Sequence, residues 1–137
     1  MKNFEYFDVT ADIGLIAYGN NLNEAFENAG LAIFNIISDT KDIEPVREIS
    51  FEITSEDEVS LLYDYLEELL FYHEIEFMLF SEFHVKIDEN LHLKATIKGE
   101  EINWDKHDRK TEIKAITYHQ MSVSKTDHVE LRAIVDL

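Results

Sequence analysis

The spacing of apolar residues predicts two helices among a series of strands. The first helix has apolar positions every three or four residues, as a buried helix face requires. These positions are Leu22, Ala25, Phe26, Ala29, Ala32, Ile33, Ile36 and Ile37. Leu31 and Phe34 widen the apolar face, so we expect this helix to be largely buried. Either Asn21 or Asn23 is suited to cap its first turn.

A second helix is predicted after Ser55, which stands three residues ahead of Glu58 in the spacing of a capping box. Its inward positions are Val59, Leu62, Leu66, Leu69 and Leu70. Asp64, Glu67 and Glu68 then form an acidic face that we expect to be solvated.

Period-two alternation of apolar and polar residues predicts the strands. They cover residues 4–7, 13–18, 47–54, 77–80, 83–87, 91–97, 114–121 and 128–136. In residues 114–121 the alternation places His119 on an apolar strand face with Ala115, Thr117 and Met121. Strands around two helices predict an α+β fold: a two-layer sandwich with a mixed or mainly antiparallel sheet and both helices packed on one face.

Length and composition predict one globular domain over residues 1–137, with 45% hydrophobic and 12% aromatic residues. The chain lacks an apolar run long enough to span a membrane, and its first residues do not resemble a signal peptide. We therefore expect a cytoplasmic protein with no membrane contact. Because the sequence contains no cysteine, disulfides, thiolate nucleophiles and cysteine-ligated metals are excluded.

The charge balance is strongly acidic. Aspartate and glutamate number 29 against 12 lysine and arginine residues, a formal net charge of -17. Direct binding to nucleic acid requires clustered positive charge, so it is not expected. The balance suits a cation or a basic protein surface as the partner.

No complete catalytic set is visible in the sequence. Gly-x-Ser-x-Gly and a phosphate-binding glycine loop are both missing. His73-Glu74 begins like a zinc-protease helix motif, but Phe77 stands where the second histidine belongs. A hydrolase would need an activated water and a general base, and we find no residues arranged for both.

The segment from Phe7 to Gly14 is the most informative stretch for function. It places Asp12 between two apolar runs, where a carboxylate needs backbone donors, a cation or water. Gly14 permits close approach of the backbone and dihedral angles closed to other residues. Two interpretations of Asp12 stay open: a turn aspartate bonded to its own backbone, or a ligand of a hard cation together with Asp136.

Several segments resemble the archease family, in the same order along the whole chain. They are Thr10-Ala11-Asp12-Ile13-Gly14, residues 23–29, residues 66–70, the loop from Gly99 to His107, residues 114–119 and the terminal Asp136-Leu137. The resemblance implies a protein cofactor, not itself an enzyme, of the RtcB-type RNA ligase that joins exons in tRNA splicing. Such a cofactor promotes formation of the ligase's guanylyl-histidine intermediate and its repeated turnover.

The resemblance also implies a divalent metal (calcium, magnesium or manganese) held by Asp12, Asp136 and an oxygen of Leu137. Many members carry histidine where this chain has Val9, so a supporting role of that imidazole is lost here. Further polar contacts are expected at Lys106, His107, Lys114 and His119. The alternative is a chaperone-like binding protein for RNA-modifying enzymes such as a tRNA methyltransferase, which would tolerate the loss of Asp12.

Overall fold

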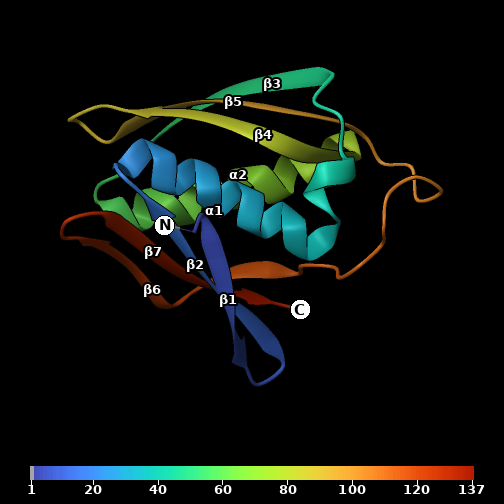
Figure 1. The fold of residues 1–137 in the computed structure, drawn as a ribbon. Coiled ribbons are helices and arrows are strands. Elements are labelled where there is room, and N and C mark those ends of the chain that lie inside the picture. Colours follow the sequence, from blue (N-terminus) through green and yellow to red (C-terminus); the bar gives the residue numbers. More distant parts are fainter. Residues whose placement is uncertain (1) are drawn as a thin grey trace.

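The structure is a computed structural model that describes residues 2–137 (Figure 1). Its strands are β1 (Phe4–Val9), β2 (Asp12–Gly19), β3 (Arg47–Thr54), β4 (Met78–Ile87), β5 (His92–Glu101), β6 (Ala115–Lys125) and β7 (Val129–Asp136). Its helices are α1 (Leu22–Ile37), the short 3-10 helix η1 (Thr40–Asp42) and α2 (Glu58–Glu76).

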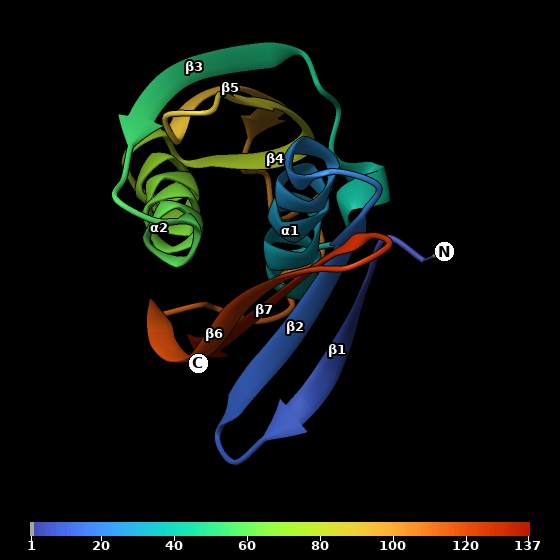
Figure 2. The same cartoon turned by 90° about the vertical axis from the view of Figure 1, so that its left-hand side faces the viewer.

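The strands form two antiparallel sheets, ordered β1-β2-β7-β6 and β3-β5-β4. The ribbon views show α1 and α2 lying between these sheets (Figures 1 and 2). The predicted α+β class and the antiparallel pairing are therefore confirmed. The arrangement of the layers differs from the expectation: the strands divide between two sheets, so the helices are covered on both sides and there are three layers.

The sequence of α1 explains the third layer. A helix packed on one sheet needs a single apolar stripe, but α1 contacts β2 on one side and β4 on the other. Gly30 stands at the β4 contact, where an added Cβ would lie 2.7 Å from the Phe83 ring. The predicted cap is also confirmed, because the Asn21 side chain accepts a hydrogen bond from the Glu24 N–H at 2.9 Å.

The N-terminus of α2 begins two residues later than the capping-box spacing predicted. Asp57, not Ser55, is the N-cap, and its carboxylate accepts the Ser60 N–H at 2.8 Å. Ser55 instead donates its hydroxyl to Asp64 at 2.6 Å. Ser55 and Asp57 are both suitable N-cap residues. Asp57 is the N-cap, and its negative charge also interacts favourably with the N-terminus of the helix.

The predicted strands 77–80 and 83–87 are one strand, β4, and Phe77 is the residue that ends α2. The register shifts between Phe80 and Glu82, so Ser81 is the extra residue of a bulge. Its hydroxyl donates to the Ile43 carbonyl at 2.9 Å, which ties β4 to the segment after η1. The bulge broke the alternation and made one strand look like two.

A larger irregularity in β6 overturns the placement of His119. Thr117 pairs with Ile134, and the next paired residue of β6, Ser122, pairs with Arg132. The four residues 118–121 therefore lie opposite the single residue Ala133. Gln120 takes a left-handed conformation with φ of 56°. As a result His119 is exposed and does not lie on an apolar face of the sheet. The prediction assumed that side chains of this strand alternate strictly between the two faces of the sheet, and the extra residues interrupt that alternation.

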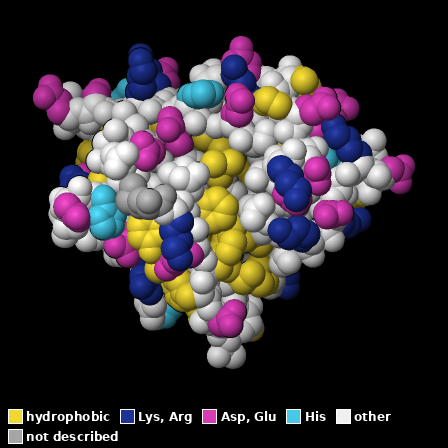
Figure 3. Space-filling view, viewed as in Figure 1, with side chains coloured by type: hydrophobic (Ala, Val, Ile, Leu, Met, Phe, Trp, Pro, Cys, Tyr) yellow, Lys and Arg dark blue, Asp and Glu magenta, His cyan; other side chains and the backbone are white. Residues whose placement is uncertain are grey.

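The face of the molecule seen in Figure 3 gathers hydrophobic side chains in its middle, over α1 and β1, with charged side chains around them. Tyr6 of β1 is 39% exposed. Its hydroxyl donates to the Ala32 carbonyl of α1 at 2.7 Å, which fixes β1 against the helix.

Candidate functional site

A tight hairpin joins β1 to β2 and positions Asp12. Val9 and Asp12 are register partners, so Thr10 and Ala11 form a two-residue turn. Ala11 has φ of 64°, a left-handed conformation that a small side chain adopts at lower cost than a bulky one. The special backbone position of this segment is thus Ala11.

Gly14 serves the hairpin in a different way from the one expected. Within residues 2–137 no glycine has a positive φ, so its freedom of dihedral angle is not used. Gly14 is the register partner of Phe7, and an added Cβ would lie 2.1 Å from the Phe7 ring. Arg132 of β7 covers the same ring, with its guanidinium carbon 4.7 Å from the ring centre. The missing side chain lets Phe7 lie flat across β2 and link three strands.

Asp12 and Asp136 are direct register partners across the ladder between β2 and β7. Val9 on one side and Ala115 on the other extend the same row through all four strands. Side chains in such a row share one face of the sheet, with Cα atoms of neighbours about 4.5–5.5 Å apart. Asp12 is three residues from the buried Leu15, so the row lies on the face opposite the helices.

The chain end that carries Asp136 is held in place. β7 is a central strand paired with both β2 and β6. The Lys114 N–H donates to the Asp136 carbonyl at 2.8 Å, and the Leu137 side chain packs against the hydrophobic core. Asp136 itself is exposed while Asp12 is half-buried. The two aspartates are therefore register partners on ordered backbone, at the ends of the central strands β2 and β7.

The donor chemistry of this pair fits a hard divalent cation. Two neighbouring carboxylates repel each other unless a cation or a proton intervenes, and oxygen ligands are those that calcium, magnesium and manganese prefer. In residues 2–137 no group of three or more His, Cys, Asp or Glu side chains is placed to hold a metal. A cation at Asp12 and Asp136 would need its other ligands from water and from main-chain or terminal oxygens, such as those of Leu137.

Lys106 and His107 lie in a separate cluster around Glu100. His107 is 2% exposed; its Nδ1 accepts the Asn103 N–H at 3.0 Å, so the proton on Nε2 points to Glu100 Oε2 at 2.9 Å. Lys106 Nζ donates to both Glu100 oxygens, at 2.8 and 2.9 Å. The Glu44 N–H completes the set at 2.7 Å. This cluster fixes the loop after β5 to the segment before β3.

Glu100 is held ionised by these donors. Desolvation acts to raise its pKa, but the Glu44 N–H, Lys106 and His107 outweigh it and hold the pKa at about 2. Lys106 and His107 thus have satisfied partners within the loop. Of the four additional polar candidates, Lys114 is the one that hydrogen bonds directly to the Asp12–Asp136 row, through its backbone.

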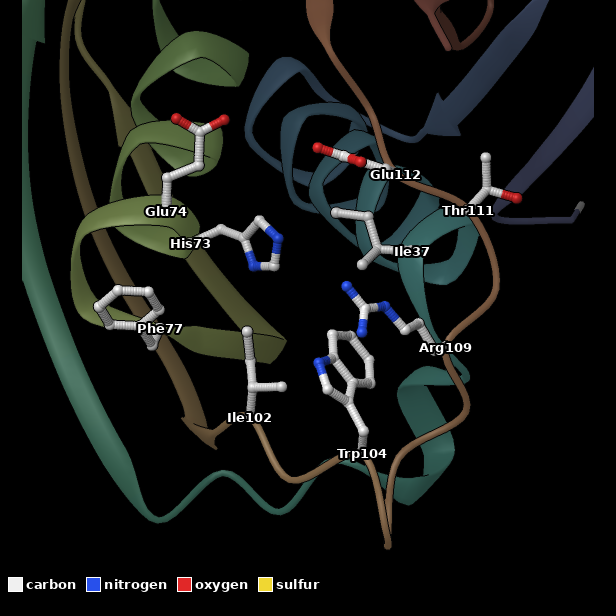
Figure 4. Close-up of a pocket in the computed structure, with 9 residues that line it drawn as sticks. All are labelled: Ile37, His73, Glu74, Phe77, Ile102, Trp104, Arg109, Thr111 and Glu112. Carbon is white, nitrogen blue, oxygen red and sulfur yellow. The ribbon is translucent and has the colours of Figure 1, made fainter.

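A cavity of about 420 Å³ was not anticipated from the sequence (Figure 4). Its lining residues are Ile37, His73, Glu74, Phe77, Ile102, Trp104, Arg109, Thr111 and Glu112. The His73 Nδ1 donates to the Met78 carbonyl at 2.7 Å, while Arg109 lies over the Trp104 ring at 5.0 Å. Two features of the sequence could have indicated this cavity. One is the loop in which Trp104 stands beside a run of basic residues, and the other is the aromatic Phe77 at the end of a helix.

The fold and the acidic pair define a class: a small α+β protein with two helices between antiparallel sheets and paired carboxylates at its chain end. Within residues 2–137, every helix is too short or too polar to span a bilayer. The sequence model of the archease protein family (MTH1598/TM1083) matches residues 4–137. The chain therefore belongs to the archease family.

The sequences of two archeases align with the whole chain. "Protein archease" of Methanothermobacter thermautotrophicus is 55% identical, and that of Sulfurisphaera tokodaii is 47% identical, each covering 100% of both chains. The solution structure of Methanobacterium thermoautotrophicum protein 1598 superposes with a TM-score of 0.89 at 53% identity, again over 100% of both chains.

Proposed function

We propose that this protein is a non-enzymatic activator of an RtcB-type RNA ligase in tRNA splicing, and that it promotes guanylylation of the ligase. The observation that carries the proposal is the direct pairing of Asp12 with Asp136 on ordered backbone at the chain end. Membership of the archease family supports the choice of partner.

Asp12, Asp136 and an oxygen of Leu137 would hold a divalent cation where the central strands β2 and β7 of the four-stranded sheet end. Positive charge at this position would offset repulsion between the nucleotide phosphates and the anionic groups around them. The residues of this chain contribute by orienting the two carboxylates: the Ala11 turn sets Asp12, and the Lys114 N–H fixes the backbone of Asp136. The contact is expected with the ligase rather than the RNA, because a net charge of -17 repels a phosphate backbone.

Single-turnover guanylylation of the ligase with GTP tests this proposal. Asp12→Ala and Asp136→Ala should remain folded, by circular dichroism and melting temperature, and lose the acceleration given by the wild-type protein. Asp8→Ala is the matched control, because Asp8 is an exposed carboxylate of the same hairpin whose register partner is Ile13. Acceleration should also fall as salt rises, if charge steers the encounter.

Undiminished acceleration by folded Asp12→Ala would refute the metal-dependent mechanism. A chaperone-like binding protein for RNA-modifying enzymes, such as a tRNA methyltransferase, would then be the better account, because that role tolerates the loss of Asp12.

A further inference from the structure

Exposed hydrophobic side chains are concentrated around α2. Residues 2–137 expose seven large hydrophobic side chains, and five of these lie on α2 or beside it. The five are Phe71 (50% exposed), Ile75 (56%), Phe77 (70%), Trp104 (37%) and Tyr118 (54%). Tyr118 stacks on Tyr63 of α2 with ring centres 3.9 Å apart. We refer to Phe71, Ile75, Phe77 and Trp104 as the α2 apolar surface.

Two hollows connect Phe71, Phe77 and Trp104, and Ile75 follows Phe71 by one turn of α2. The 420 Å³ cavity contains Phe77 and Trp104, and Glu74 lines its rim together with Glu112 (Figure 4). A smaller pocket of about 170 Å³ is lined by Phe71, Glu74 and Lys114, among others. Glu74 belongs to both, so the hollows adjoin along the C-terminal half of α2.

Phe77 occupies a backbone position that a bulky residue adopts at a cost. It ends α2 in the left-handed region, with φ of 54° and ψ of 48°. Where a helix ends in this conformation, the residue is usually glycine and sometimes asparagine. Because 70% of Phe77 is exposed, core packing does not account for an aromatic residue here. Strain of this kind, kept at an exposed position, points to a functional contact.

Acidic side chains outnumber lysine and arginine around the two hollows. Glu67, Glu74 and Glu112 line them, against Arg109 and Lys114, and the C-terminal end of the α2 dipole adds to the negative potential. The last turn of α2 contains no basic side chain besides His73. Arg109, although it lines the cavity, is placed over Trp104. An apolar surface with this rim is complementary to an apolar side chain flanked by Lys or Arg.

The surface also adjoins the acidic pair. Ala115 lines the smaller pocket and is the register partner of Asp136. Lys114 lines the same pocket, and its N–H donates to the Asp136 carbonyl. A protein bound along the C-terminal half of α2 would therefore extend to the edge strand β6 and the Asp12–Asp136 row.

We propose that the α2 apolar surface is the docking site for a basic protein surface that presents an apolar anchor. The inference rests on the proposed function, in which that partner is the RNA ligase, and it adds where the ligase binds. Docking at α2 and action at Asp12 and Asp136 are then separate steps, and substitutions can separate them.

Binding is tested by the Kd for the ligase, measured by biolayer interferometry with immobilised full-length protein. Phe77→Asn and Ile75→Ser should each raise the Kd about tenfold, as the loss of a central anchor does. Val46→Ser is the matched control: Val46 is 69% exposed, close to the 70% of Phe77, but it lies outside α2, in the segment before β3. Phe77→Asn should not lower the melting temperature, because asparagine tolerates the left-handed conformation.

The contribution of negative charge to binding is tested with a second pair of variants. Glu74→Gln should weaken binding and reduce the dependence of the Kd on salt. Glu89→Gln, in the exposed turn between β4 and β5, removes the same charge away from α2 and should change neither.

Guanylylation kinetics separate docking from activation. Phe77→Asn should raise the protein concentration that gives half-maximal acceleration and leave the plateau at saturation unchanged. Asp12→Ala should lower the plateau with the Kd unchanged. A wild-type Kd for Phe77→Asn and Ile75→Ser would overturn the docking site alone, while a wild-type protein that neither binds nor accelerates the ligase would overturn the proposed function as well.

Discussion

Asp12 and Asp136 stand directly opposite each other in the antiparallel ladder of β2 and β7, although 123 positions separate them in sequence (136 minus 12, less one). Like charges at opposite ladder positions destabilise a sheet, by about 0.2–1 kcal/mol per pair. The pair should therefore destabilise the sheet without a counter-ion and bind a cation when one is present.

Asp136→Asn should stabilise the metal-free protein and remove its response to metal. In EDTA the substitution relieves the repulsion, so the melting temperature should rise, corresponding to about 0.2–1 kcal/mol. In millimolar calcium the wild-type protein should gain stability by binding, and Asp136→Asn should gain little. Scanning fluorimetry with EDTA, calcium, magnesium and manganese measures both effects. Asp8→Asn should keep the wild-type response; an equal response from all three proteins would contradict a cation at this pair.

We expect Leu137 to contribute separately to stability and to the proposed cation site. Leu137→Ala removes a side chain that packs on the core but keeps the terminal carboxylate. We expect a loss of about 1 kcal/mol, the value for partial burial of a leucine, with the calcium response retained. Deletion of residues 136–137 should lower stability and abolish that response. Urea unfolding with and without calcium distinguishes these outcomes, and a full calcium response from the deletion would exclude the chain end as a ligand.

Glu100→Gln should destabilise the protein by about 1–3 kcal/mol, because it weakens bonds to Lys106 and leaves the buried His107 with a poorer partner. Glu101→Gln is the matched control, since the neighbouring side chain is 77% exposed. The measurement is urea unfolding at pH 7. Equal stability of the two variants would show that the cluster contributes little.

The same comparison has a defined pH dependence. The pKa of Glu100 is about 2 in the folded protein against an ordinary 4.5, so the folded state favours the ionised form. The stabilisation is fully present above the unfolded pKa and is lost as pH falls from about 4.5 toward 2. The stability gap between wild type and Glu100→Gln should therefore narrow over that interval and stay constant between pH 6 and 8.

The sequence was sufficient to predict features that depend on local patterns. The apolar period of α1 and the cap at Asn21 are confirmed, because both depend on residues within two turns of each other. The strand position of Asp136 was also predicted, whereas Asp12 was expected between two strands and is the first residue of β2. Their direct pairing is set by the register of two strands from opposite ends of the chain.

Other features depend on extra residues that interrupt the alternation along a strand, or on contacts between residues far apart in the sequence. The bulge at Ser81 and the extra residues around His119 interrupt the alternation on which the strand predictions relied. The division of the strands into two sheets follows from contacts of α1 on both of its sides. Likewise, the cavity between α2 and Trp104 joins segments about 30 residues apart, whose proximity no local pattern records.

The last prediction concerns Val9, which occupies the same ladder row as Asp12 and Asp136. An imidazole introduced by Val9→His would stand beside Asp12, so both carboxylates would raise its pKa above the ordinary value of about 6.5. A raised pKa means that the added stability is present in full below the unfolded pKa and disappears as pH rises through the folded pKa. Stability of Val9→His relative to wild type should thus be greatest near pH 6 in EDTA. Val46→His, at an exposed position outside the row, should show no such trend.

The charged imidazole would also compete with a cation for the two carboxylates. The calcium response of Val9→His should therefore be weaker than that of wild type at pH 6 and equal to it at pH 8, where the imidazole is largely neutral. Ligase stimulation at pH 8 should be unchanged or higher, because a neutral imidazole can support an oxygen ligand without displacing the cation. If Val9→His instead folds normally and loses stimulation at pH 8, the proposed site depends on an apolar side chain at this position.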